Sequence, residues 1–259
     1  MKPVISSISY CPVKSISFQN IQSCEIRKNL GIVNDRIFAF SRNIDLEKAK
    51  LIEKDAKERK LNYFLTLKNS PVLNKYNFVY ENNKLTLNSN NKDIISISTN
   101  EPSEKLLLAN KLMELENSLL KPITLLKNIE HPFYDTSHSK NIFNSMSLIN
   151  LNSIKDFEKK INQNIEPQRF RANFYIDGIE PWEECNWIGK IIKINKVSFK
   201  VEKNIPRCVA INLKPKTDDN SLNLLQSLKK SYNHFDMGIY LVALDGGKIE
   251  IGNKIEVKN

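Results

Sequence analysis

Short runs of alternating apolar and polar residues, separated by turn residues, dominate the first hundred positions of the chain. Such runs are typical of half-buried β-strands. Between them, residues 45–61 carry so many charges that an exposed helix or a loop is expected there. The first part of the chain is therefore predicted to be mostly β. The predicted strands lie at residues 3–10, 21–28, 37–40, 63–67, 78–80, 84–87 and 94–97.

Helical spacing of apolar residues begins near residue 101. Pro102 and Ser103 provide a start signal, apolar positions recur at helical intervals to residue 120, and Pro122 ends the pattern. This helix is predicted to link two halves of the chain. The second half alternates strand patterns with a helix capped by Ser153 and a helix over residues 221–232, and it closes on a glycine turn and a hairpin. The fold class predicted is mainly β with a few helices (α+β), built as a β-barrel.

One stretch, residues 203–215, carries the strongest candidate for chemistry. Cys208 follows Pro206 and Arg207 and is predicted to open an apolar strand over residues 208–213. A permanent positive charge on Arg207 would favour the thiolate and hold an anion. The alternative is a small, buried core cysteine.

Basic residues recur near other predicted strand ends. Arg169, Arg171 and Asn173 alternate, which places them on one face of a predicted strand. That face either holds an anion, faces solvent or forms ion pairs. Lys14 and Arg36 lie in predicted turns and are ordinary solvated charges unless they converge on one anion.

Composition limits the classes of protein to which this chain can belong. The 259 residues are 41% hydrophobic and 26% charged, with a formal net charge of +10. The lysines are scattered in a chain rich in Asn and Ile, so nucleic-acid binding is not predicted. No run of about 18 apolar residues could span a membrane, and the first residues lack a secretion signal, so a cytoplasmic protein is expected.

Metal sites made only of side chains are not predicted. The four cysteines form no C-x-x-C pair, so neither a zinc site nor a disulfide framework is indicated, and free thiols are expected. His131, Asp135 and His138 are close in sequence, but their spacing fits no ligand pattern.

An ordered series of motifs does identify a family. The pieces YCPVKS, NDRIFAF, FLTLKNSP, RFRANFYIDG, IPRCVAINLKP and GIYLVALDGGKIEIGNKIEV occur in this order over nearly the whole chain. Together they resemble MOSC-domain proteins with an N-terminal MOSC β-barrel domain, the group that includes the mitochondrial amidoxime-reducing component. MOSC domains also form the C-terminal part of molybdenum cofactor sulfurases. The resemblance implies an N-terminal β domain at residues 1–121 and a MOSC domain at residues 122–259.

The resemblance also implies a cofactor site. Cys208 would be the catalytic residue and the protein ligand of the metal in a molybdenum–molybdopterin cofactor, because soft sulfur suits a metal already held by dithiolene sulfurs. The phosphate and the pterin edges need cationic and amide donors. The predicted cofactor-binding residues are Lys14, Ser15, Arg36, Asn144, Ser145, Arg171, Asn173 and Arg207.

The function implied is that of a molybdenum oxidoreductase that reduces N-hydroxylated or N-oxygenated small molecules. Electrons are expected from a separate donor protein, such as a ferredoxin, a cytochrome b5-like protein or a flavoprotein. The chain departs from the family pattern in two places. It reads Asn204-Ile205-Pro206 where many relatives have a further cysteine before the Pro-Arg-Cys motif, and it has Ala172 where proline is usual. Two alternatives stay open: a sulfurase-like transferase module, and a non-catalytic cofactor-binding protein.

Overall fold

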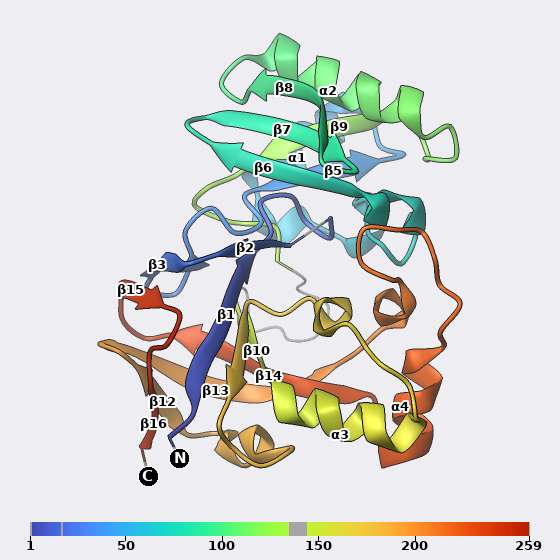
Figure 1. Ribbon diagram of the computed structural model, residues 1–259. Helices are drawn as coiled ribbons and strands as arrows, with labels where there is room; N and C mark the ends of the chain where they lie inside the picture. Colours follow the sequence, from blue (N-terminus) through green and yellow to red (C-terminus); the bar gives the residue numbers. More distant parts are fainter. Residues whose placement is uncertain (1, 17, 135–143, 259) are drawn as a thin grey trace.

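The computed structural model describes residues 2–16, 18–134 and 144–258. Figure 1 shows a lower part built on one large sheet and an upper part with smaller sheets and two helices. Within the described residues the fold mixes strands with helices, which confirms the predicted α+β class.

The large sheet has eight strands in the order β16-β12-β13-β14-β10-β11-β1-β2. Only β10 and β11 run parallel, and all other neighbours are antiparallel. The strands are β1 (Val4–Tyr10), β2 (Gln19–Ile21), β10 (Met146–Asn150), β11 (Phe174–Asp177), β12 (Ile191–Ile194), β13 (Val197–Pro206), β14 (Asp236–Ala243) and β16 (Ile255–Lys258).

Backbone hydrogen bonds curl this sheet into a barrel. Val4 bridges Lys254, and Gly252 donates to the carbonyl of Ile5 at 2.7 Å, so β1 meets the segment that leads into β16. Closing the sheet in this way satisfies edge groups that would otherwise be unpaired. A smaller sheet of β3 (Ser23–Arg27), β4 (Gly31–Ile32) and β15 (Gly247–Glu250) lies beside the barrel.

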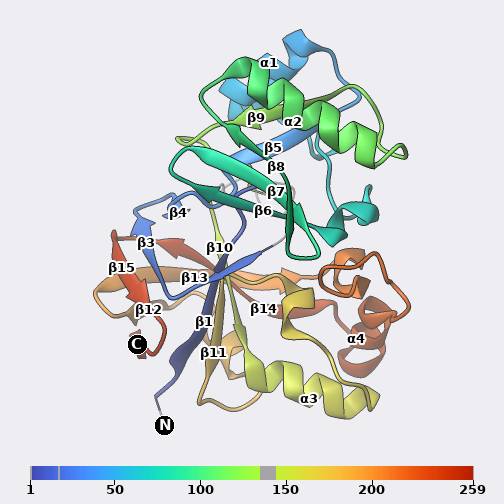
Figure 2. The same cartoon turned by 45° about the horizontal axis from the view of Figure 1, so that its top comes forward.

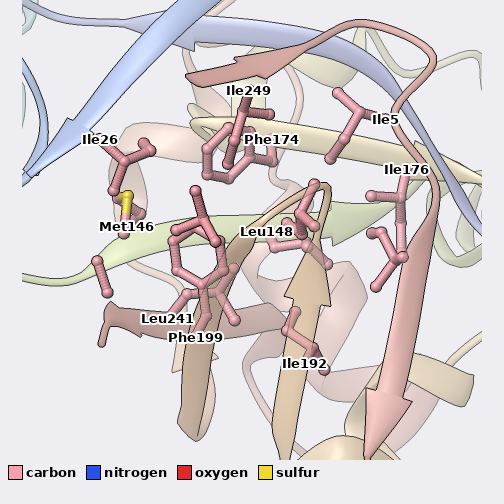
Figure 3. Close-up of a cluster of buried hydrophobic side chains, with 14 of the residues drawn as sticks. Ile5, Ile26, Met146, Leu148, Phe174, Ile176, Ile192, Phe199, Leu241 and Ile249 are labelled. Carbon is pink, nitrogen blue, oxygen red and sulfur yellow. The ribbon is translucent and has the colours of Figure 1, made fainter. Parts of the chain in front are cut away.

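Alternating side chains from these strands fill the barrel. Figure 3 shows Leu148, Phe174, Phe199 and Leu241 pointing toward one another, and each is fully buried. Gly238 allows β14 to approach β10 closely, because a Cβ there would lie 2.4 Å from the carbonyl oxygen of Leu148.

The upper part has a separate apolar core. It contains a two-stranded sheet, a three-stranded sheet and two helices. The two-stranded sheet pairs β5 (Phe38–Arg42) with β9 (Ile123–Lys127), the three-stranded sheet is made of β6 (Tyr76–Glu81), β7 (Lys84–Ser89) and β8 (Lys92–Ser98), and the helices are α1 (Leu46–Lys54) and α2 (Pro102–Leu115). Figure 2 shows α2 across this part of the molecule, where it contacts β8 and β9. The helix predicted at residues 101–120 is confirmed over the shorter range of α2. Of the two alternatives for residues 45–61, a helix or a loop, the structure has a helix over the range of α1.

Two further helices, α3 (Leu151–Ile161) and α4 (Leu224–Tyr232), pack against each other beside the barrel (Figure 1). The prediction that Ser153 caps α3 is wrong. The side chain of Asn150 accepts the capping hydrogen bond, from the backbone N–H of Asn152, and Ser153 is buried inside the first turn.

Strand pairing crosses the predicted domain boundary at residues 121 and 122. β1 and β2, from the predicted first domain, belong to the barrel, and β9, from the predicted second domain, pairs with β5. Hydrogen bonds between strands distant in sequence produce this exchange, and local patterns cannot show it. The division of the chain into two domains at residue 121 stays a prediction, and the sheets contain strands from both sides of it.

The described chain also contains short 3-10 helices between its strands. They are η1 (Ala56–Glu58), η2 (Leu61–Tyr63), η3 (Pro71–Lys75), η5 (Pro167–Phe170), η6 (Glu183–Trp187) and η7 (Val209–Asn212). The strand predicted at residues 63–67 is wrong, since only a single bridge between Ser41 and Phe64 forms there. In the described ranges, no helix is both long and apolar enough to cross a membrane.

Candidate functional site

Cys208 lies just beyond the end of β13, on a turn that leads into η7. The predicted strand at residues 208–213 is wrong, because Pro206 is the last strand residue and the N–H of Ile211 bends back to the carbonyl of Cys208 at 3.2 Å. The side chain of Cys208 is exposed. The alternative of a buried core cysteine is therefore excluded, and the thiol is open to a ligand.

The other cysteines lie in different surroundings. Cys11 and Cys24 are buried, Cys185 is half-buried, and all four thiols are free, as predicted. Burial raises the pKa of Cys24 and of Cys185 to about 12. A protonated thiol is a poor nucleophile and a poor metal ligand, so these cysteines differ chemically from an exposed one.

A cleft of about 580 Å³ surrounds Cys208. Its lining comes from segments that are far apart in the sequence: Ser15, Leu61, Asn62, residues 66–69, residues 169–171, residues 205–208, Ala210, Ile211 and Tyr240. This volume is within the range of roughly 300–1,000 Å³ that is usual for ligand pockets. Four of the predicted site residues line it together: Ser15, Arg171, Arg207 and Cys208.

The lining of this cleft has a positive charge. Lys68, Arg169, Arg171 and Arg207 contribute to it, and no Asp or Glu does among the described residues. An adjoining cleft of about 460 Å³ shares Arg169 and Arg171 and again contains no carboxylate in the described chain. Its other polar groups are mainly carboxamides, from Gln19, Asn20, Asn74, Asn77 and Gln168. The two clefts together suit an anion that carries a hydrogen-bonding heterocycle.

Arg171 lies between the two clefts and has a left-handed backbone, with φ of 53°. Its guanidinium donates to the carbonyl oxygen of Ile16 and lies 5.0 Å from the ring centre of Phe18. No carboxylate lies within ion-pair distance of it in the part of the chain that is described. Burial lowers its pKa, and the nearby charge of Arg36 acts in the same direction. An anionic ligand would relieve both costs.

Arg36 approaches the same aromatic ring from the N-terminal part of the chain. Its guanidinium carbon lies 5.2 Å from the ring centre of Phe18 and 5.0 Å from that of Tyr134, and it forms an ion pair with Asp35. Burial lowers the pKa of Arg36, but the negative charge of Asp35 and the nearby Tyr134 raise it by more. The pKa therefore lies above its usual value, and the guanidinium stays charged. The convergence of Arg36 and Arg171 on Phe18 brings together two arginines that are 135 positions apart in sequence.

Asp35 holds this arrangement in place. Its carboxylate is fully buried, and four groups donate to it. The donors are the backbone N–H of Cys11 at 2.7 Å, the hydroxyl of Tyr134 at 3.2 Å, the side-chain amide of Asn173 at 3.2 Å and the guanidinium of Arg36. Such complete satisfaction is what allows a buried charge to persist. Sequence reasoning missed Asp35, Tyr134 and Phe18, although Asp35 directly precedes Arg36.

The side chain of Asn173 forms hydrogen bonds with other groups in the protein interior. Its side-chain oxygen accepts from the N–H and hydroxyl of Ser147, both at 3.1 Å, and its amide donates to Ser9 and Asp35. The residue is fully buried and lines neither cleft. Direct contact between Asn173 and a cofactor stays a prediction. The hydrogen bond that Asn173 donates to Asp35 orients the carboxylate of Asp35.

Arg36 lines neither cleft, and cofactor binding by it stays a prediction. Three further predicted residues also lie outside the lining of both clefts. Lys14 is buried and donates to the carbonyl of Phe133 at 3.1 Å. Asn144 donates to the carbonyl of Asn29 at 2.8 Å, and Ser145 is partly exposed next to it. Cofactor binding by these three residues stays a prediction.

Arg207 is used mainly by the protein itself. Its Nε donates to the carbonyl of Met237 at 2.8 Å, and its Nη1 donates to that of Phe170 at 2.7 Å. Burial lowers its pKa. These bonds tie the turn that carries Cys208 to β14 and to η5, so the arginine positions the cysteine.

The prediction that Arg169 lies on a strand is wrong. Residues 167–170 form η5 rather than a strand, so Arg169, Arg171 and Asn173 do not share one strand face. Arg169 is buried and pairs with Glu166 at 2.6 Å, and its Nη1 donates to the carbonyl of Asn212 at 2.7 Å. One of the alternatives considered above, an ion pair, thus applies to Arg169 and not to Arg171.

Comparison with protein families finds a match in the second half of the chain. The family model of the MOSC domain matches residues 135–256, a range that includes Arg171, Arg207 and Cys208. The chain carries a MOSC domain. The molybdenum cofactor sulfurase of Drosophila willistoni is 30% identical over 116 residues, which are 42% of this chain and 14% of the sulfurase. The chain therefore matches only about a seventh of that relative.

Solved structures with a similar course of the chain include two bacterial proteins. The YuaD protein of Bacillus subtilis is 11% identical, with a TM-score of 0.46 over 99% of this chain and 96% of that protein. YiiM of Geobacillus stearothermophilus is 16% identical, with a TM-score of 0.35 over 44% of this chain and 54% of that protein.

A search of the described residues finds no metal site made only of side chains. Across residues 2–16, 18–134 and 144–258, no three His, Cys, Asp or Glu side chains lie close enough to hold an ion. Asp135 and His138, which were considered with His131, lie outside the described residues.

Proposed function

We propose that this protein binds a molybdenum–molybdopterin cofactor in the two adjoining clefts and reduces N-hydroxylated or N-oxygenated small molecules. The observation that carries the proposal is an exposed thiol, Cys208, in the lining of a cleft that has basic residues and no carboxylates in its described lining. The MOSC domain, and the relative named as a molybdenum cofactor sulfurase, support the identity of the cofactor.

The residues present fit such a group. Cys208 would supply a soft thiolate to the metal, and Arg171 would offer its charge to the phosphate from a site where no carboxylate competes in the described lining. Ser15, which lines the same cleft, would add a hydroxyl. The carboxamides of the adjoining cleft match the alternating donors and acceptors of a pterin edge.

The other site residues keep these groups in place. Arg207 fixes the turn that carries Cys208, and Asp35 with Tyr134 keeps Arg36 charged and oriented toward Phe18. When bound, the cofactor would supply two-electron oxygen-transfer chemistry. Cleaving one N–O bond in this way consumes two electrons and two protons and releases water, and a separate donor protein would supply the electrons.

The decisive experiment begins with expression in a host that makes molybdopterin. The purified protein is expected to hold about one molybdenum per chain, and with dithionite as electron donor it should convert an amidoxime to the amidine in a single turnover. Protein without molybdenum, from a host whose cofactor synthesis is verified, would contradict cofactor binding. Protein with molybdenum but no reduction would contradict the reductase activity alone.

A sulfurase-like or carrier role is the second candidate. The observation that favours it is the relative named as a molybdenum cofactor sulfurase. The same preparation separates the two candidates: a carrier is expected to release its cofactor to an apo-molybdoenzyme and restore the activity of that enzyme, without reducing amidoximes. A reductase should show the opposite pattern.

A further inference from the structure

The Cys208 cleft has few side chains that could supply a proton to a bound substrate, although cleavage of an N–O bond consumes two. Its lining contains no Asp, Glu or His in the described residues. Hydroxyls, carboxamides and guanidiniums are too weakly acidic. Three side chains of the lining have ordinary pKa values between about 8 and 11, namely those of Cys208, Lys68 and Tyr240. Since Cys208 is the proposed metal ligand, Lys68 and Tyr240 are left as proton donors.

Tyr240 is held by the barrel and faces away from its core. It lies on β14 between Ile239 and Leu241, whose side chains belong to the core cluster of the barrel. Figure 3 shows Leu241 among these core side chains. Successive side chains of a strand point to opposite faces, so the ring of Tyr240 leaves the core and reaches the cleft. Its backbone pairs with Lys203 of β13 and with Ser147 of β10, so the ring starts from a fixed position.

Two guanidiniums lie close enough to Tyr240 to interact with its charge. Burial lowers the pKa of Arg207, and a negative charge on Tyr240 is the strongest influence in the opposite direction. Burial also lowers the pKa of Arg36, while Asp35 and, less strongly, Tyr240 raise it. Coulomb attraction is mutual, so Arg207 and Arg36 stabilise the phenolate that remains after Tyr240 gives up a proton.

Lys68 is less suited to this role. Its side chain is exposed, and its ammonium is at the end of a flexible four-carbon stem. A general acid must lie within hydrogen-bond reach of the atom that it protonates, which a ring anchored on a strand achieves at a smaller entropic cost. The arrangement of the described lining therefore favours Tyr240.

We propose that Tyr240 is the general acid that protonates the substrate nitrogen as its N–O bond breaks. This inference rests on the proposed reductase function. An amidoxime takes up two electrons from the donor and two protons, and it yields the amidine and water. The O–H bond of Tyr240 breaks, its proton forms an N–H bond at the substrate nitrogen, and the electron pair stays on the phenolate. The substrate oxygen takes the second proton from solvent, and the phenolate takes a proton from water before the next turnover.

Tyr240→Phe tests the inference, because it keeps the ring and removes the hydroxyl. In single-turnover amidoxime reduction with dithionite, the rate constant per bound molybdenum should fall about 100-fold or more. The molybdenum content and the Tm should match those of the wild type. Tyr63→Phe is the matched control: Tyr63 is also partly buried and follows Leu61 and Asn62 of the cleft lining, but it does not line the cleft, and its rate should be unchanged.

The pH dependence of the rate separates proton transfer from a positioning role. The rate per bound molybdenum in the wild type should fall at alkaline pH, when the general acid loses its proton. Site-specific incorporation of 3-fluorotyrosine at position 240 should move this fall to lower pH, because fluorine makes a phenol more acidic. In Tyr240→Phe the remaining slow reaction should lack this fall. A ring that only positions its neighbours predicts the same pH dependence in all three proteins.

The outcomes distinguish this inference from the proposed function. A full rate in Tyr240→Phe, or an unshifted pH dependence in the fluorotyrosine protein, would overturn the role of Tyr240 and leave the reductase proposal standing. A loss of rate in Lys68→Ala together with a full rate in Tyr240→Phe would assign the proton to Lys68 instead. A molybdenum-loaded wild type that reduces no amidoxime would overturn both proposals. If Tyr240→Phe fails to fold, the fluorotyrosine protein, which differs by one small atom, still decides.

Discussion

Replacement of Cys208 by Ser separates a ligand cysteine from a structural one. The side chain is exposed and heads a turn whose contacts with β14 and η5 are made by Arg207. The free energy of unfolding should therefore change by no more than about 0.5 kcal/mol, since surface substitutions away from special features rarely cost more. For a chain of this size, the Tm should shift by about 1–2 °C.

Turnover should respond quite differently. Serine keeps the volume but removes the soft, polarisable sulfur, so reduction per bound molybdenum is expected to fall by about 100-fold or more. The assay is single-turnover amidoxime reduction with dithionite, measured beside molybdenum content and thermal unfolding.

Cys24→Ser is the matched control. Cys24 is buried in the barrel core, so an imperfectly paired hydroxyl there should cost about 1–3 kcal/mol of stability and leave turnover per bound molybdenum intact. Full turnover per bound molybdenum in Cys208→Ser would refute the thiolate-ligand mechanism.

Three other predictions concern buried charges. Arg171→Ala should lower the molybdenum content per chain at least about tenfold while the protein stays folded. Lys68→Ala, which changes an exposed residue of the same cleft, is the control and should have a smaller effect on the molybdenum content, which metal analysis measures for both variants. Asp35→Asn leaves Arg36 without its counter-charge and should cost about 3–5 kcal/mol in urea unfolding, and a cost near zero would contradict the role assigned to Asp35. Burial raises the pKa of Glu184 above 4.5, so the folded state binds this proton more tightly than the unfolded chain; stability should fall as the pH rises from about 4.5 through the folded pKa, and Glu184→Gln should remove that slope in thermal melts at a series of pH values.

Alternation of apolar and polar residues predicted the β character of the chain, and helical spacing predicted α2, because both features depend on which local face is buried. The same reasoning failed at residues 208–213 and 169–173. Both segments show strand-like alternation, but they contain 3-10 turns, and Arg171 adopts a left-handed conformation. Contacts with segments far away in sequence decide these conformations, so no local pattern contains them.

Burial was the other property that the sequence could not supply. Lys14 and Arg36 were indistinguishable from solvated charges in turns, yet Lys14 is buried and Arg36 is mostly buried beside the fully buried Asp35. The family resemblance singled out both cations, because it carries long-range information that composition and spacing lack. It said nothing of Asp35, Phe18 or Tyr134, the groups that hold Arg36 in position here.

The Pro-Arg-Cys motif has a physical explanation in this fold. Pro206 has no N–H to continue the ladder, and it is the last residue of β13. Arg207 still donates its backbone N–H to the carbonyl of Phe235 at 2.8 Å, and its guanidinium binds the carbonyls of Met237 and Phe170, so the chain is anchored one residue after the strand ends. Cys208 is the first residue beyond that anchor. It is therefore both exposed and fixed in place, which is the combination that a metal ligand requires, because a loose thiol would lose conformational entropy on binding and a buried one could not be reached.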